Sequence, residues 1–312
     1  MNFTTNLLAT SVALMVPLLL AALGELVSER SGVMNIGLEG MIAAGAYFGF
    51  TVMQSSHSAW LAAVVGIGCG MAVAALMVVV CVWGHADQIL AGFALFILVP
   101  GFVAYLFIQS TSGSTTATTT QADATGLLPS LDVPLLHHIP IVGDSFFSGN
   151  GFYYATIVLC VVVWFLITRT RFGLNTQAVG HDPLVAESRG VSVRRVRTLA
   201  VLFCGGCAGL AGVALTVGAV GAFTPGIVGG RGFIAIAIVI LGRWRIGWTV
   251  LAALVVSLCQ ALELRLTEVA PGFPVLLLGA LPWVVVVLML ILGARAFTGA
   301  PRALGTQLTG SH

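Results

Sequence analysis

The sequence predicts an all-α, polytopic membrane protein with about nine transmembrane segments (eight to ten). Its 312 residues are 58% hydrophobic and 8% charged, and the mean hydropathy is +1.06. Soluble proteins carry about 25% charged residues, since much of a folded surface must face water. The apolar residues also form runs of about membrane-crossing length, and arginine is concentrated in a few connecting segments. A net charge of only +2 does not indicate a basic surface for binding a nucleic acid.

A helix needs about 20 mainly apolar residues to cross the hydrocarbon core, and nine runs approach or exceed that length. The first run has no basic leader and is too long for a typical signal peptide, so we expect it to remain as an uncleaved span. The expected segments are residues 7–27, 33–53, 60–83, 88–109, 152–168, 195–220, 228–242, 247–265 and 273–293.

Two of these segments, 33–53 and 228–242, are rich in glycine and interrupted. Paired, interrupted segments in the two halves of a chain are typical of transporters built from inverted repeats. Broken helices occur at membrane depth only where they line a cavity or are buried in protein. We therefore expect Gly-broken half-helices with inverted-repeat character.

Some glycines are separated by three residues, a spacing that lets helix backbones approach closely in lipid. Chance alone would also produce some pairs among 38 glycines. We expect specific close packing at Gly45 and Gly49, at Gly66 and Gly70, and at Gly205 and Gly209.

The distribution of arginine predicts the topology. Six of the 13 basic residues, all of which are Arg, lie between residues 169 and 197, whereas the polar stretch 110–151 contains none. The positive-inside rule places 169–194 in the cytoplasm and 110–151 outside, as a periplasmic loop. The N-terminus is then outside, and residues 294–312 form a short cytoplasmic tail that we expect to be loosely packed. Residues 1–312 constitute one transmembrane domain.

Five residues near the interrupted segments are candidates for a substrate pathway. A carboxylate within a span is costly and usually faces the protein interior or water. Glu39 is either a pathway residue or a hydrogen-bonding group that holds the broken segment. Arg231 pairs with a carboxylate, holds the carbonyl groups of the broken helix or meets solute directly. Asp87 is typical of a helix N-cap. The candidates are Asn35, Glu39, Gln88, Phe223 and Arg231.

The segment 177–190 has the features of a short cytoplasmic helix framed by arginine. Proline suits the first helical turn and glycine suits the stop. Such a helix is what a membrane domain would offer to a soluble motor, although an ordinary loop is the alternative. The residues expected to make the motor contact are Gly180, His181, Asp182, Pro183, Ala186, Glu187 and Gly190.

Signals of catalysis are missing from the sequence. It contains no zinc-protease motif, no nucleophile elbow and no P-loop, so this chain is not itself an ATPase. Cys204 and Cys207 have the CxxC spacing but no second ligand pair, so we interpret all six cysteines as small apolar residues. We expect no catalytic residue, no metal site and no cofactor in this chain.

Three stretches resemble signatures of a known family in order and spacing. Residues 25–40 (ELVSERSGVMNIGLEG) resemble the opening signature of nucleoside-type permeases, which belong to the ribose and branched-chain-amino-acid permease superfamily of ABC importers. Residues 178–183 (AVGHDP) with 190–197 (GVSVRRVR) look like that family's coupling-helix region. Residues 230–244 (GRGFIAIAIVILGRW) look like its third signature.

The resemblance implies a permease subunit that translocates nucleosides, with purine nucleosides favoured, across the inner membrane of a bacterium by alternating access. The implied partners are a second permease, giving a heterodimer, an ATPase that uses ATP and Mg²⁺, and a periplasmic or lipid-anchored substrate-binding protein. The family usually has Asn-Gln where this chain has Asp87-Gln88, and Glu-Asn-Pro where it has residues 181–183. The alternatives are a permease for simple sugars such as ribose, or a secondary transporter driven by an ion gradient.

Overall fold

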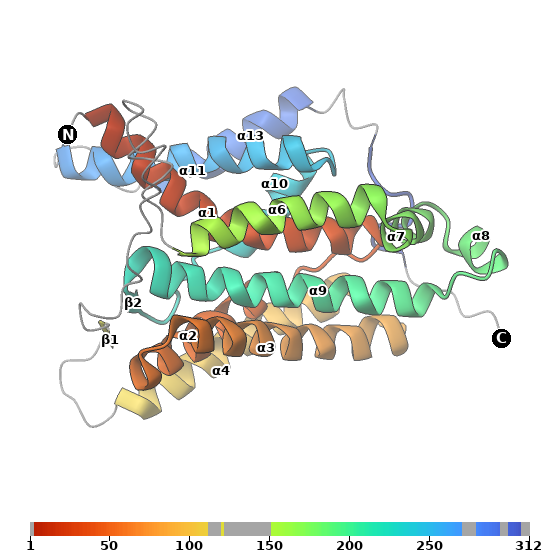
Figure 1. Ribbon diagram of the computed structural model, residues 1–312, viewed down its shortest axis with the longest axis horizontal. Coiled ribbons are helices and arrows are strands. Elements are labelled where there is room, and N and C mark those ends of the chain that lie inside the picture. The colour runs from red at the N-terminus through yellow and green to blue at the C-terminus, as the bar shows by residue number, and fades with distance from the viewer. Residues whose placement is uncertain (1–2, 112–119, 122–150, 270–278, 294–298, 307–312) are drawn as a thin grey trace.

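The computed structural model of the chain is a bundle of helices that run mostly along one axis (Figure 1). It describes residues 3–111, 120–121, 151–269, 279–293 and 299–306. The elements are α1 (Phe3–Arg30), α2 (Leu38–Ser56), α3 (Ala59–Met77), the π-helix η1 (Val78–Trp83), α4 (Gln88–Thr111), β1 (Thr120–Gln121), α6 (Gly151–Arg169), α7 (Arg171–His181), α8 (Pro183–Ser188), α9 (Val193–Val213), the π-helix η3 (Ala214–Val220), β2 (Ala222–Phe223), α10 (Arg231–Leu241), α11 (Ile246–Val269) and α13 (Leu281–Gly293).

The all-α, multi-pass character predicted from composition is confirmed. Within the described residues, six helical stretches are long and apolar enough to cross a membrane. The other three expected segments correspond to α2, to the 11-residue α10 and to the 13 described residues of α13. The six stretches of membrane-crossing length are Asn6–Arg30, Ala59–Trp83, Gln88–Thr111, Gly151–Arg169, Val193–Val220 and Ile246–Leu266.

The centre of the bundle is formed by α9 and α1. α9 packs against α1, α2 and α3, and α1 also packs against α10 and α11. In the most apolar stretch of Val193–Val220, 83% of the residues are buried, against 22% in Gly151–Arg169. The outward faces of α4 and α6 are apolar, with side chains such as Leu98 and Val161 more than half exposed. These faces suit lipid or a partner helix rather than water.

The expected close packing at the glycine pairs is confirmed. A Cβ on Gly45 would collide with the backbone of Gly209, and a Cβ on Gly209 would collide with the backbone of Gly66. On Gly70, a Cβ would collide with the carbonyl oxygen of Gly205. The backbones of α2, α3 and α9 therefore touch where any larger residue would separate them, as small-residue packing in lipid requires.

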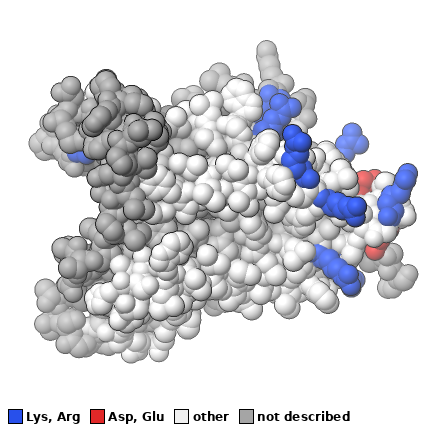
Figure 2. All heavy atoms as spheres, in the orientation of Figure 1, with Lys and Arg blue, Asp and Glu red and all other residues white. Residues whose placement is uncertain are grey.

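The two ends of the bundle differ in charge. Figure 2 shows arginine gathered at the end that carries α7 and α8, next to an uncharged middle. We call this the arginine end. We call the opposite end, where β1 pairs antiparallel with β2 through Thr120–Phe223 and Gln121–Ala222, the strand end. The exposed arginines of the arginine end are Arg169, Arg171, Arg189, Arg194, Arg195, Arg243, Arg245 and Arg302.

The expectation of a loosely packed C-terminal tail is wrong for residues 299–306. The amide of Ala303 donates to the carbonyl oxygen of Gly180 at 2.9 Å. The carbonyl oxygen of Thr306 accepts from Gln88 Nε2 at 3.3 Å and from Arg197 Nη1 at 3.4 Å. This segment is held because it supplies backbone partners to polar groups that the helices bury at the arginine end. The rest of the expected tail, and residues 112–119 and 122–150 of the expected periplasmic loop, lie outside the described residues.

Candidate functional site

Two interrupted segments lead into the site. Residues 31–37 follow α1 and precede α2, and residues 224–230 follow β2 and precede α10, with no α-helix in either segment. Gly229 and Gly230 both have positive φ, of 55° and 81°, a conformation that favours glycine. α10 is about 16 Å long at 1.5 Å per residue. It ends next to Arg243 at the arginine end, so it begins within the depth of a bilayer about 30 Å thick.

Glu39 joins the two interrupted segments. Its Oε1 accepts the amide N–H of Gly230 at 2.8 Å, and its Oε2 accepts that of Gly232 at 2.7 Å. Glu39 itself lies in the first turn of α2. The carboxylate therefore lies at the N-termini of two helices, where the unpaired amides and the helix dipole favour negative charge.

The approach of α10 to α2 depends on Gly232. A Cβ at this position would lie 2.6 Å from the backbone nitrogen of Glu39, so only glycine fits. Of the two interpretations of Glu39, its hydrogen bonds match the one in which it holds the broken segment. Whether it also meets solute stays a prediction.

Arg231 is the first residue of α10 and faces back over the interrupted segment. Its Nη1 donates to the carbonyl oxygens of Ile227 at 2.8 Å and Val228 at 3.0 Å. Arg231 thus holds the carbonyl groups of the broken helix, as one of the interpretations of the sequence expected. Its Nε is buried and has no hydrogen-bond partner among the described residues.

A cavity of about 230 Å³ lies beside this arginine. Its polar wall comes from Arg231 on α10 and from Gln260 and Glu263 on α11, and the Oε1 of Gln260 is buried without a partner in the described part of the chain. The charges of Glu263 and Arg231 attract each other. Trp283 contributes an aromatic wall. The remaining lining residues are Leu14, Gly229, Ile234, Leu264, Gly279 and Pro282.

The cavity offers the contacts that a hydroxylated ring uses. The Arg231 guanidinium donates hydrogen bonds, the oxygens of Gln260 and Glu263 accept them, and a Trp face packs on the apolar side of a ring. The volume is below the roughly 300 Å³ at the lower end of small-molecule pockets. A solute larger than one ring would therefore need the cavity to widen. In the described residues, no group of three or more His, Cys, Asp or Glu could hold a metal ion.

Asn35 lies apart from this cavity, in a polar cluster inside the bundle. Its backbone N–H donates to Glu25 Oε1 at 3.0 Å, and its Nδ2 lies 3.5 Å from Cys204 Sγ. Cys204 Sγ donates to Glu25 Oε2 at 3.2 Å. All three residues are 0% exposed. In this conformation Asn35 ties residues 31–37 to α1 and α9.

Gln88 and Phe223 also lie away from the cavity. Gln88 Oε1 accepts the N–H of Met34 at 3.0 Å, which links the start of α4 to the first interrupted segment. Phe223 is 2% exposed and lies near the strand end. Its ring packs 5.4 Å from those of Tyr47 and Phe107. The structure thus brings Glu39 and Arg231 together and leaves the other three candidates in separate surroundings.

The expected coupling segment forms two short helices, α7 and α8, at the arginine end. Asp182 Oδ1 accepts the amides of Leu184 and Val185, each at 3.1 Å, and Pro183 occupies the first turn of α8. Gly190 ends the turn with φ of 83°. The first-turn proline and the stop are those that the sequence predicted, and Asp182 adds an N-cap. Asp87 caps α4 in the same way, with its Oδ1 2.8 Å from the amide of Ile89.

Some residues of this segment face the bundle and are buried, whereas others face outward and are exposed. Ala186 packs with Val179, Val193 and Val196 in a small apolar cluster beneath α8. Gly180 lies so close to the carbonyl oxygen of Arg30 that a side chain would collide with it. His181, Asp182 and Glu187 are exposed. The fold therefore holds the inner face of α8 and leaves its outer face open at the tip of the bundle (Figure 1).

No sequence pattern singled out Gln260 or Trp283 as lining residues of the cavity. A lone Gln within an apolar span is the signal that could have identified position 260. No pattern in the sequence connects it with Arg231, because the contact depends on the packing of α10 against α11.

The comparisons with known proteins agree with this architecture. The family model described as "Branched-chain amino acid transport system / permease component" matches residues 7–294. The chain is 38% identical to a putative glucose ABC transporter permease protein of Haloferax volcanii, over 85% of this chain and 79% of that protein. It is 30% identical to a nucleoside ABC transporter permease protein of Lactococcus lactis and to a guanosine ABC transporter permease protein of Bacillus subtilis, each over 93% of this chain and 92% of the relative.

No solved structure matches the chain. The family match covers most of the sequence and includes both interrupted segments and the α7–α8 region. The chain therefore belongs to the permease-component family of the branched-chain amino acid transport system, and it is a multi-pass ABC transporter permease.

Proposed function

We propose that this chain is the membrane-spanning permease subunit of an ABC importer that translocates nucleosides, purine nucleosides first, by alternating access. The observation that carries the proposal is the polar cavity beside the broken helix α10, at bilayer depth, where Arg231, Gln260 and Glu263 can bind the hydroxyl groups of a ribose. The nucleoside assignment is supported by the names of two relatives, a nucleoside permease and a guanosine permease, each of which matches 93% of this chain.

A simple-sugar substrate is the second candidate, because the relative at 38% identity is named as a putative glucose permease. The cavity chemistry suits both classes, since a nucleoside and a sugar share a hydroxylated ring. An ion-coupled secondary transporter is not favoured by any of these relatives, which are named as ABC permeases.

The proposed topology has nine membrane segments in one transmembrane domain, with the arginine end in the cytoplasm and the N-terminus outside a bacterial inner membrane. The positive-inside rule supports this orientation. α2, α10 and α13 bring the number of proposed membrane segments to nine. In the proposed dimer of permeases, these three segments pack against protein. The loop at 110–151 is then periplasmic, and residues 294–312 are cytoplasmic.

The proposed assembly pairs this chain with a second permease, as a heterodimer, with ATPase subunits and with a substrate-binding protein. ABC permeases of this family imply the ATPase and the binding protein as partners. Within the cytoplasmic segment 169–194 of this chain, three exposed residues would contact the ATPase: His181 at the end of α7, Asp182 at the N-cap of α8 and Glu187 on α8. ATP and Mg²⁺ would be bound by that ATPase, and no cofactor by this chain.

Uptake by cells with and without the gene tests the substrate. Labelled guanosine should enter only cells that carry the gene, and excess unlabelled adenosine should compete more strongly than glucose or ribose. Gene-dependent uptake of labelled glucose or ribose, without gene-dependent uptake of labelled guanosine or adenosine, would replace the nucleoside assignment with the sugar one. Gene-independent uptake of all four compounds would contradict both assignments.

A further inference from the structure

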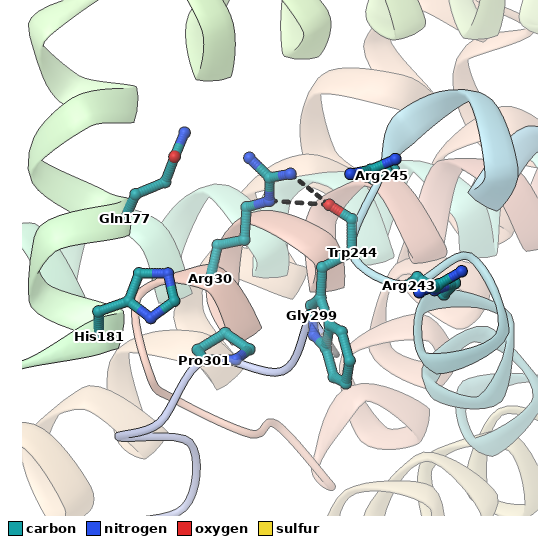
Figure 3. Close-up of a pocket in the computed structure, with 8 residues that line it drawn as sticks. All are labelled: Arg30, Gln177, His181, Arg243, Trp244, Arg245, Gly299 and Pro301. Atoms are coloured by element: carbon teal, nitrogen blue, oxygen red, sulfur yellow. Dashed lines mark hydrogen bonds between the residues drawn. The ribbon is translucent and has the colours of Figure 1, made fainter. Parts of the chain in front are cut away.

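A second pocket, of about 130 Å³, lies at the arginine end (Figure 3). It is bounded by the last residue of α1, by α7, by the turn between α10 and α11, and by the C-terminal segment 299–306. No residue lines both this pocket and the cavity beside Arg231. The residues that line the pocket are Arg30, Gln177, His181, Arg243, Trp244, Arg245, Gly299 and Pro301.

The charged side chains that line this pocket in the described part of the chain are arginines. Three of the lining residues are arginines and a fourth is histidine, and no carboxylate is among the lining residues that the structure describes. Arg30 and Arg245 are close enough for their charges to repel each other. Glu29 lies behind the wall, fully buried, and accepts the indole N–H of Trp244. An anion in the pocket would relieve the repulsion between the two guanidinium groups.

The central guanidinium is fixed in position. Arg30 donates from Nε at 2.9 Å and from Nη2 to the carbonyl oxygen of Trp244. Arg243 and Trp244 both have positive φ, 51° and 54°, in the turn that presents this carbonyl. Figure 3 shows Arg30 between Gln177 and His181 on one side and Arg245 on the other. A planar guanidinium held in this way is suited to a tetrahedral oxyanion.

The pocket lies at the depth of lipid headgroups. Arg30 is the last residue of the span Asn6–Arg30, and Arg245 directly precedes the span Ile246–Leu266. Trp248, three residues after Arg245 and therefore on the same side of the helix, is 54% exposed. Leu251, one turn further on, is 45% exposed. An apolar surface thus continues from the pocket into the bilayer, where an acyl chain would lie.

We propose that this pocket binds the phosphate group of an anionic phospholipid from the leaflet at the arginine end. The pocket volume of about 130 Å³ has room for a small oxyanion such as one phosphate group. Basic pockets between membrane helices bind lipid headgroups in this way. The bound lipid links α1, α7 and the α10–α11 turn, and so supports the base of α8 without depending on which solute is transported.

Lipid retention by the full-length chain, purified in a nonionic detergent, tests the proposal. Phosphatidylglycerol and phosphatidylcholine with the same acyl chains are titrated, and bound lipid is counted by native mass spectrometry. Phosphatidylglycerol should bind more tightly, and Arg245→Gln should weaken its binding about fivefold, the effect expected for one arginine near the membrane surface. Arg171→Gln is the matched control, since Arg171 is exposed at the same end but does not line the pocket.

Further measurements distinguish a phospholipid from inorganic phosphate and from a protein partner as the ligand of the pocket. If millimolar inorganic phosphate displaces phosphatidylglycerol from the native chain but not from Arg245→Gln, the phosphate site stands and also accepts a soluble ion. Equal retention of phosphatidylglycerol by the native chain and both variants would overturn the proposal. Loss of the lipid when the ATPase is added would overturn the lipid assignment in favour of a protein partner.

Discussion

Replacing Glu39 by Gln should loosen the junction between α2 and α10 while leaving the side-chain volume almost unchanged. The two carboxylate oxygens accept the amides of Gly230 and Gly232 at 2.8 and 2.7 Å. A glutamine has one acceptor oxygen, so one amide loses its partner. A hydrogen bond to a charged group contributes about 1.5–3 kcal/mol. Glu39→Gln should therefore cost about that much, and Glu39→Ala, which loses both bonds, about twice as much.

Thermal unfolding in detergent measures the effect. For domains of 150–250 residues, 1 kcal/mol corresponds to about 2–4 °C in Tm, so Glu39→Gln should lower Tm by about 3–12 °C and Glu39→Ala by more. Glu187→Gln, on the exposed face of α8, should leave Tm unchanged, because surface substitutions have small effects. Equal Tm values for the native chain and both Glu39 variants would refute the view that this carboxylate holds the broken helix.

Three further predictions follow from particular contacts. Gly209→Ala places a Cβ against the backbone of Gly66 and should destabilise the bundle by about 1–3 kcal/mol. Gly68→Ala, whose Cβ meets nothing within 4 Å, should leave stability unchanged. A lower Tm for Gly68→Ala than for Gly209→Ala would contradict this prediction. Asp182→Ala removes the cap of α8, worth about 1 kcal/mol, and should abolish uptake while the binding protein still captures solute; normal uptake would exclude α8 as the motor contact. Gln260→Leu should reduce uptake without lowering Tm, because it removes a buried oxygen that has no partner in the described residues; reduced uptake accompanied by a lower Tm would point to a structural role.

Features that depend on short stretches of sequence were predicted well. The cap at Asp87 follows from residues two and three positions away, and the first-turn proline at 183 and the stop at Gly190 are equally local. The glycine pairs predicted close helix contact because the requirement for a small residue repeats once per helical turn. The helical segments followed from apolar length alone, although α10, with 11 residues, is too short to cross a bilayer by itself.

Features that depend on distant residues could not be predicted from the sequence. The contact of Cys204 with Glu25 joins positions 179 residues apart, and it places Asn35 in a buried cluster away from the cavity. The docking of residues 299–306 has no periodic signal, because the segment is held through its backbone carbonyl and amide groups. The cavity beside Arg231 likewise unites α1, α10 and α11.

The central claim is that ATP hydrolysis by a partner drives nucleoside uptake through this permease. The most direct measurement is uptake of labelled guanosine by cells with and without the gene, each treated with vanadate or with an uncoupler. The account predicts gene-dependent uptake that vanadate abolishes and that an uncoupler does not block directly. Gene-dependent uptake that the uncoupler blocks at once and vanadate leaves intact would contradict it and would assign the transport to an ion gradient.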